Sequence, residues 1–298
     1  MNQIMKIIFY VIVFVTISFA QNKTIFKPIS GFHEDANKLI EEFLISTENE
    51  TGRKIAVFDG DGTVLGQTPH YLADECMYAY IKSKPGHRTG LLNEMINQSN
   101  VSIPYVQNRI RLLAGLSLNE MREMGKQCFK ERYSDKIFEP MRQLINVLKQ
   151  NGFEVWIVTG SPEAMYQGFL SEELEIPVTN IIGVKSVIRH GIITEEIVHP
   201  VPQDRGKMEA IETFIQDKPL IVGGNSRGDK EMIEFSKGLR IIVNPDTFVA
   251  PDQTESISDY AKKEGWIILR INDTPDDSIP WISTEDYKIK RNKTNIVK

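Results

Sequence analysis

The stretch KIAVFDGDGTVLG, residues 54–66, decides how the rest of the chain is interpreted. Residues 54–58 form a short, mostly apolar and partly β-branched run bounded by turn residues, which is typical of a buried strand. Asp59 and Asp61 then stand two positions apart in a glycine-containing turn. Because Asp-Gly pairs are common turn formers, the stretch alone leaves two interpretations open, an ordinary turn or a functional site.

Five further strand-like runs follow along the chain, at residues 153–160, 180–188, 218–224, 239–245 and 265–271. Helical patterns lie between several of them, as in residues 207–216. Strands that alternate with helices predict an α/β fold, with a Rossmann-like, mostly parallel sheet and helices on both faces. Residues 186–197 predict a β-hairpin with a His-Gly turn.

Composition limits the class of protein. The chain has 298 residues, of which 41% are hydrophobic and 25% charged, so it can bury a full core. Its formal net charge is -5 and no long basic run occurs, which argues against a nucleic-acid partner. Residues 69–150 are rich in Leu, Met, Glu, Arg and Lys at helical spacing, and predict a mainly helical segment.

The N-terminal residues 1–20 predict a secretory signal, since Lys6 precedes an uncharged run that ends in small residues. A membrane anchor is the alternative, but the run is shorter than the roughly 20 apolar residues that a span needs. We therefore expect cleavage, export to the periplasm or secretion, and no stable membrane anchor afterwards. In an oxidising compartment Cys76 and Cys128 either form a disulfide or remain two buried thiols.

The ends of the predicted strands carry polar residues that a parallel sheet would bring to one edge. These residues, with one lysine at a helix start, are Asp59, Asp61, Thr63, Thr159, Gly160, Ser161, Lys207, Asn225 and Asp229. Hydroxyls, a lysine and loop glycines suit phosphate, because backbone N–H groups can approach phosphoryl oxygens at glycines. Clustered carboxylates stay ionised together when a cation lies among them, and oxygen ligands favour Mg²⁺.

Four motifs in this order resemble those of the haloacid dehalogenase superfamily of phosphohydrolases. FDGDGT (58–63) is similar to its DxDGT nucleophile loop, and WIVTGS (156–161) to its apolar strand that ends in Thr or Ser. Lys207 matches its separate lysine, and GGNSRGD (223–229) is similar to its acidic GDxxxD element.

The resemblance implies a domain organisation. Residues 21–66 and 139–298 would form the core, and residues 67–138 a helical cap over the site. Caps of this kind exclude bulk water and select small substrates. The size and helical character of the insert resemble the phosphoserine-phosphatase-like branch, which includes exported phosphocholine phosphatases.

The resemblance also implies roles for individual residues. Asp59 would attack phosphorus and form an aspartyl-phosphate, and Asp61 would be the general acid and then the base. Thr159 and Lys207 would hold and neutralise the transferring phosphoryl group. The substrate phosphate would also meet Thr63, Gly160 and Ser161, although a helix N-cap is the alternative role for Ser161.

The implied Mg²⁺ ligands are Asp59, Asp61, Asn225 and Asp229. The family usually has a metal-binding Asp where this chain has Asn225, so the site loses one negative charge. Two interpretations follow, an active phosphatase with weaker metal binding or a degenerate relative that only binds a small ligand or phosphate. Because Asp59 and Asp61 are both kept, we expect an exported, Mg²⁺-dependent phosphatase acting on a small phosphorylated metabolite.

One stretch of the insert suggests a substrate. Tyr71, Glu75 and Tyr78 fall at i, i+4 and i+7, on one face of a predicted helix. An acid between two tyrosines could hold a quaternary ammonium, as in phosphocholine, by charge and cation–π contact. The alternative is an ordinary half-buried cap helix.

Overall fold

The computed structural model describes residues 23–251, 253–276 and 278–292, so the predicted signal, residues 1–20, lies outside the described residues. Its centre is a six-stranded sheet with the order β3-β2-β1-β6-β7-β8, in which every neighbouring pair is parallel. The strands are β1 (Ile55–Phe58), β2 (Glu154–Pro162), β3 (Ile181–Val184), β6 (Ile221–Gly224), β7 (Leu239–Val243) and β8 (Ile267–Leu269). The predicted α/β fold with a parallel sheet is confirmed.

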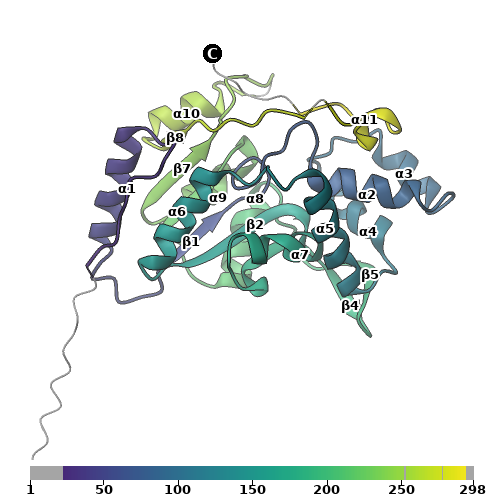
Figure 1. Cartoon of the computed structure of the whole chain (residues 1–298), viewed down its shortest axis with the longest axis horizontal. Helices are drawn as coiled ribbons and strands as arrows, with labels where there is room; N and C mark the ends of the chain where they lie inside the picture. The colour runs from purple at the N-terminus through teal and green to yellow at the C-terminus, as the bar shows by residue number, and fades with distance from the viewer. Residues whose placement is uncertain (1–22, 252, 277, 293–298) are drawn as a thin grey trace, which may run out of the picture.

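Helices cover both faces of this sheet (Figure 1). One face packs against α1 (Glu34–Ser46), α6 (Glu139–Gln150) and α7 (Glu163–Glu173), and the other against α8 (Arg205–Ala210), α9 (Lys230–Glu234) and α10 (Ile257–Lys263). Alternate residues of β1 divide between the two cores, with Ala56 and Phe58 in the first and Ile55 and Val57 in the second. This is the period of two that a strand buried on both faces requires.

Four helices lie between β1 and α6, at the right of Figure 1. They are α2 (Leu72–Lys82), α3 (Thr89–Met95), α4 (Ile103–Leu113) and α5 (Leu118–Arg132). The antiparallel hairpin of β4 (Ser186–Arg189) and β5 (Ile192–Ile197) forms as predicted and lies beside them. The run 180–188, predicted as one strand, is divided between β3 of the main sheet and β4 of the hairpin.

Helix α5 crosses α7 closely because each contributes a glycine to the contact. A Cβ atom at Gly125 would lie 2.0 Å from the carbonyl oxygen of Met165, and one at Gly168 would lie 2.0 Å from that of Arg122. Further along the crossing, Phe129 stacks on a phenylalanine of α7. The inserted helices are thus packed directly on the helix that follows β2.

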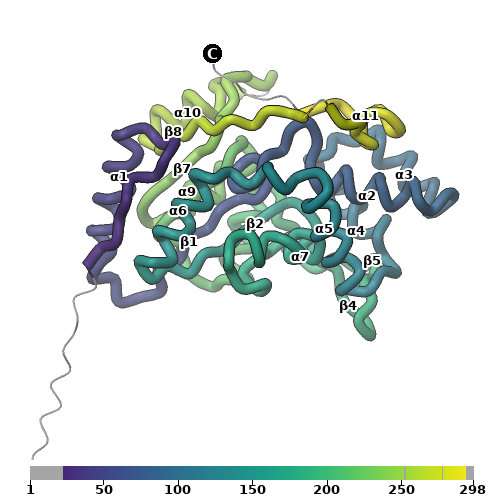
Figure 2. The backbone as a smooth tube through the Cα atoms, in the orientation of Figure 1, coloured from purple at the N-terminus to yellow at the C-terminus, as the bar shows by residue number. Residues whose placement is uncertain are grey.

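Two further features hold the inserted helices in place. A disulfide joins Cys76 of α2 to Cys128 of α5, which decides between the two states that the sequence left open. The C-terminal segment after β8, residues 272–292 and here called the strap, runs across the molecule to α11 (Ile282–Glu285) beside α2 (Figures 1 and 2). The strap buries Trp281 and stacks Tyr287 on Tyr78 with ring centroids 4.5 Å apart.

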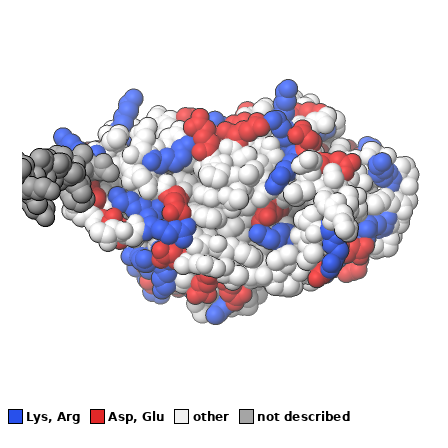
Figure 3. All heavy atoms as spheres, turned by 90° about the horizontal axis from the view of Figure 1, so that it is seen from below, with Lys and Arg blue, Asp and Glu red and all other residues white. Residues whose placement is uncertain are grey.

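Basic and acidic side chains are interspersed on the face of the molecule shown in Figure 3.

Within the described ranges, no helix has the length and apolar character that crossing a bilayer requires.

Candidate active site

A pocket of about 290 Å³ opens where the carboxyl ends of β1, β2 and β6 meet the inserted helices. Core residues that line it include Asp59, Asp61, Thr159, Gly160, Ser161, Lys207 and Asn225, and the inserted helices add Tyr71 and Arg109. Six of the residues predicted from strand ends, with Lys207 from a helix start, therefore share one cavity. This grouping follows from the parallel sheet, which places the ends of its strands at one edge.

Asp59 continues directly from β1, and its backbone N–H donates to the carbonyl oxygen of Gly223 at 2.9 Å. Its Oδ1 accepts a hydrogen bond from Lys207 Nζ at 2.6 Å. Its Oδ2 has one contact among the described residues, with Thr63 Oγ1 at 3.5 Å. Burial raises the pKa of Asp59 to about 7, with Lys207 opposing the shift and Asp229 adding to it. One oxygen of this carboxylate is therefore fixed, and the other is available.

Lys207, near the start of α8, lies between two carboxylates. Its Nζ is 2.6 Å from Asp59 Oδ1 and 2.5 Å from Asp229 Oδ1. Although burial opposes the charge on each group, the lysine holds the pKa of Asp229 below its usual range and the carboxylates raise that of Lys207. The ammonium charge is therefore kept at the end of β1, beside the pocket.

Asp229 lies behind this lysine and does not line the pocket. Its Oδ2 accepts hydrogen bonds from Asn225 N at 3.0 Å, Ser226 N at 2.9 Å and Ser226 Oγ at 3.1 Å. Its other oxygen is held by Lys207. With both oxygens engaged, Asp229 fixes the loop after β6 and the lysine, and is less suited to the metal ligation predicted for it.

Asp61 has a hydroxyl donor on each oxygen. Ser161 Oγ donates to Oδ2 at 2.7 Å, and the Tyr166 hydroxyl donates to Oδ1 at 2.6 Å. Burial raises the pKa of Asp61, while these two hydroxyls oppose the shift. Tyr166 was missed by the sequence reasoning, because it belongs to no motif and reaches the site only through the placement of α7.

The other residues that were predicted to contact phosphate lie close to these carboxylates. Thr159 is buried and its Oγ1 accepts from the backbone N–H of Ser161 at 3.2 Å. The N-cap residue of α7 is Pro162, so the alternative role of Ser161 as a helix cap is wrong. Thr63 is fully buried below Asp59 and does not line the pocket.

Mg²⁺ needs a shell of oxygen donors, and the residues around Asp59 offer a mixed set. No group of three or more His, Cys, Asp or Glu side chains with a metal-binding arrangement is found in the described part of the chain. A cation here would therefore depend on mixed oxygen donors, namely the Asp59 carboxylate, the Asp61 carbonyl and the Asn225 amide. The Asn225 side chain makes no hydrogen bond to the described residues, and waters commonly complete an Mg²⁺ shell. The residues present fit a weakly held, oxygen-ligated Mg²⁺.

The inserted helices contribute a buried ion pair that was not predicted. Arg109 Nε of α4 donates to Asp74 Oδ1 of α2 at 2.8 Å, and both side chains are almost fully buried. The guanidinium lies 5.0 Å from the ring centroid of Tyr105 and 5.7 Å from that of Tyr71. Because the pair joins two helices far apart in sequence, no spacing in the chain could have indicated it.

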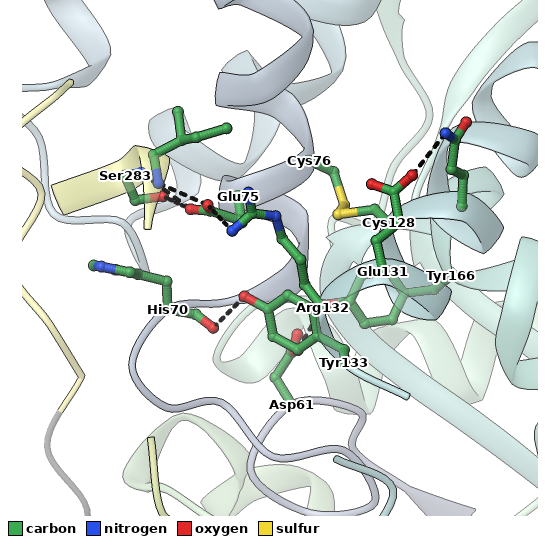
Figure 4. The surroundings of a disulfide bond; sticks show 12 residues. Asp61, His70, Glu75, Cys76, Cys128, Glu131, Arg132, Tyr133, Tyr166 and Ser283 are labelled. Atoms are coloured by element: carbon green, nitrogen blue, oxygen red, sulfur yellow. Dashed lines mark hydrogen bonds and ion pairs between the residues drawn. A yellow bond between two sulfur atoms is a disulfide. The ribbon is translucent and has the colours of Figure 1, made fainter. Parts of the chain in front are cut away.

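The predicted cation-binding face of α2 does not form, which corrects that hypothesis. Tyr71 lines the pocket, but Glu75 and Tyr78 do not. Glu75 is fully buried and points to Ser283 of the strap and to Arg132, whereas Asp61 lies beyond Tyr133 (Figure 4). The hydroxyl of Tyr78 bonds that of Tyr105 at 2.8 Å, between α2 and α4. Helical spacing was correct, but the strap covers part of the face that was expected to reach the site.

Curated proteins match about half of this chain in sequence. Phosphoserine phosphatase SerB1 of Mycobacterium tuberculosis is 23% identical over 164 residues, which cover 53% of this chain and 49% of that protein. The chain thus spans about half the length of the curated relatives it matches.

Two solved structures share the fold. A conserved protein of unknown function from Anaerococcus prevotii superposes with a TM-score of 0.62 at 14% identity, covering 85% of this chain and 98% of that one. A protein of unknown function from Bordetella pertussis gives 0.58 at 17% identity, with 74% and 99% covered. The model of the haloacid dehalogenase-like hydrolases matches residues 56–234, from β1 to the end of α9. This chain belongs to the haloacid dehalogenase-like hydrolase family.

Proposed function

We propose that the chain is an exported phosphatase that hydrolyses a small phosphomonoester through an aspartyl-phosphate on Asp59. The observation that carries the proposal is that one oxygen of the Asp59 carboxylate is fixed and the other is available in the pocket. Lys207 holds one of its oxygens at 2.6 Å, while the other oxygen has only the 3.5 Å contact with Thr63 within the described residues. An oriented carboxylate with one available oxygen is what an attack on phosphorus requires.

The neighbouring side chains supply the other parts of such a reaction. Lys207 places a positive charge beside the position of the phosphoryl group, and Thr159 adds a hydroxyl. Asp61 carries a proton for the leaving oxygen and then accepts one from the attacking water, a task favoured by its raised pKa. A bound Mg²⁺ would neutralise charge on the phosphoryl oxygens, and Asp59, Asn225 and the Asp61 carbonyl would hold it.

The cap side of the pocket limits the substrate. A cavity of about 290 Å³ suits a small metabolite that carries one phosphate. Glu75, which was expected to attract a quaternary ammonium, is buried at the strap, and the Arg109 guanidinium that lines the pocket is paired with Asp74. A small phosphomonoester without a quaternary ammonium therefore fits better than phosphocholine, and the likeness to a protein named phosphoserine phosphatase supports this class.

Two features support export. Residues 1–20 have the pattern of a secretory signal, and the disulfide between Cys76 and Cys128 suits an oxidising compartment. N-terminal sequencing of the protein recovered from the cell envelope or the medium tests this part of the proposal. A mature protein that begins near residue 21 supports it, and an intact N-terminus in the cytoplasm contradicts it.

Hydrolysis of p-nitrophenyl phosphate, with Mg²⁺ and with a chelator in its place, tests the activity. We expect turnover that depends on Mg²⁺, and a panel of small phosphorylated metabolites then identifies the substrate class. Label from ³²P-labelled substrate should remain on acid-denatured protein, and Asp59→Asn should carry none. Ligand binding without turnover on the whole panel would favour the alternative, a non-catalytic binding protein on this fold.

A further inference from the structure

We propose that Tyr166 is a positioning residue for catalysis, which holds the carboxyl group of Asp61 in the orientation that proton transfer to the leaving group needs. This inference rests on the proposed function, because it assumes that Asp61 is the general acid. It adds a residue outside the four motifs that directs the acid without touching the reacting phosphorus.

The hydrogen bonds of Asp61 carry the proposal. The Tyr166 hydroxyl donates to Oδ1 at 2.6 Å and Ser161 Oγ donates to Oδ2 at 2.7 Å, so each carboxyl oxygen has its own donor. Rotation of the carboxyl group would break both bonds at once, because hydrogen bonds weaken steeply away from their preferred angles. A carboxylate has about four acceptor positions, so these two contacts leave positions for the catalytic proton.

Tyr166 is itself held firmly. Its side chain is fully buried, and its ring centroid lies 5.3 Å from that of Phe169. A Cβ atom at Gly60 would lie 3.6 Å from the Tyr166 ring, so the ring packs below the loop that carries Asp61. Helix α7 is fixed in turn by its close crossing with α5. The phenol is thus a rigid support between the inserted helices and the acid.

The phenol also stays a donor. Its hydroxyl is the donor in the bond to Asp61 Oδ1. The proton that is transferred to the leaving group is therefore the one on Asp61.

The effect of the position of this proton on the reaction rate depends on how basic the leaving group is. In the first step a bond forms between Asp59 and phosphorus, the bond from phosphorus to the leaving oxygen breaks, and that oxygen takes its electrons and the Asp61 proton. A basic phenolate needs this proton as it leaves, whereas p-nitrophenolate is stable without it. A misplaced Asp61 therefore slows the reaction of phenyl phosphate more than that of p-nitrophenyl phosphate.

The test compares kcat/KM of Tyr166→Phe with that of the unchanged protein on these two substrates, which differ only in the para nitro group. We expect a loss of about tenfold on phenyl phosphate and of roughly threefold or less on p-nitrophenyl phosphate. Tyr133→Phe is the matched control, because it also removes one fully buried tyrosine hydroxyl, which donates to the His70 carbonyl at 2.9 Å. Tyr133→Phe should change kcat/KM on both substrates by the same factor.

Equal losses on both substrates in a folded Tyr166→Phe protein would overturn the inference and leave Tyr166 a structural residue. If Tyr166→Phe does not fold, Ser161→Ala is used, because it removes the donor on the other oxygen of Asp61. If the ratio of kcat/KM on phenyl phosphate to kcat/KM on p-nitrophenyl phosphate is unchanged in that variant, the inference is overturned as well. Failure of the proposed function is distinguishable, because the unchanged protein would then hydrolyse neither substrate. If only the acid role of Asp61 is wrong, Asp61→Asn hydrolyses phenyl phosphate as fast as the unchanged protein does, and the inference is overturned.

Discussion

Two buried carboxylates with cationic partners lie in different parts of this molecule. Asp59 lies at the end of β1, with Lys207 and Asp229, and we call these three the strand-end cluster. Glu75 lies under the strap, with Arg132 and Ser283, and we call these three the strap cluster. Asp59 is 4% exposed and Glu75 is 0% exposed, so burial does not distinguish them.

The two clusters differ in how far their carboxylate oxygens are used. Both oxygens of Glu75 are saturated, by Ile282 N at 2.7 Å, Ser283 N at 3.0 Å and Ser283 Oγ at 2.8 Å. Asp59 keeps one oxygen with only a long contact, and this oxygen belongs to a residue that lines the pocket. Burial with an ion pair therefore does not identify a reactive carboxylate. A reactive carboxylate is identified by an oxygen atom that remains available for a ligand.

Replacing the carboxylate of the strand-end cluster should give the largest effect. We expect Asp59→Asn to lower kcat by at least about a thousandfold, because it removes the attacking oxygen and leaves nearly the same shape. Circular dichroism and thermal unfolding should show a folded protein, since Lys207 keeps its bond to Asp229. More than a few per cent of residual hydrolysis in the purified variant would contradict the covalent mechanism.

Removing the disulfide beside the strap cluster should change stability and leave the chemistry intact. Cys76 and Cys128 are separated by 52 residues, and closing a loop of this length stabilises the fold by about 4 kcal/mol in the chain-entropy account. We expect Cys76→Ala with Cys128→Ala to lose much of this free energy of unfolding in urea titrations. At low temperature kcat should stay within about twofold of the original value. A loss of activity without a loss of stability would contradict this expectation, because the disulfide would then act on the geometry of the pocket.

Glu75→Ala should destabilise the fold by about 3 kcal/mol, because it leaves buried N–H donors of the strap without an acceptor. Glu75→Gln, which keeps one acceptor oxygen, should cost less. Urea unfolding measures both, and kcat/KM of the folded variants should be close to that of the unchanged protein. A selective rise of KM for a cationic substrate would restore the hypothesis that Glu75 binds substrate, and would weaken the distinction between the clusters.

The smallest expected effect concerns the neutral residue beside the strand-end cluster. Asn225→Asp adds a carboxylate to the pocket that Asp59 also lines, so we expect Mg²⁺ to bind about tenfold more tightly. Isothermal titration with MgCl₂ measures this, and Asn225→Ala is the matched control that should weaken binding. Unchanged or weaker affinity of the aspartate variant would show that residue 225 does not contact the metal.

Several features of the fold and site were predictable from local sequence. Apolar runs such as residues 54–58 are buried on both faces, and their alternation with helices is enough to predict a parallel sheet. Polar residues that follow such strands meet at one edge whatever their distance along the chain. For this reason Asp59, Thr159 and Asn225 could be assigned to one pocket before the structure was known.

Residues placed by contacts between distant segments could not be predicted in this way. Helical spacing put Glu75 and Tyr78 on one face, but no local pattern indicates that the strap would cover that face from 207 residues further along the chain. Tyr166 reaches Asp61 through the crossing of α5 with α7. Arg109 reaches the pocket through the pairing of α4 with α2.

The sequence by itself determined the sheet, the edge where the site lies and the acidic, hydroxyl and lysine side chains gathered there. These depend on periodicity and on the direction of strands, which are local properties of the chain. Only the tertiary structure decided which buried carboxylates keep an oxygen for a ligand, and which hydroxyls hold Asp61. Those properties depend on the packing of helices and of the strap, because hydrogen bonds between segments form only where side chains come within about 3 Å of each other.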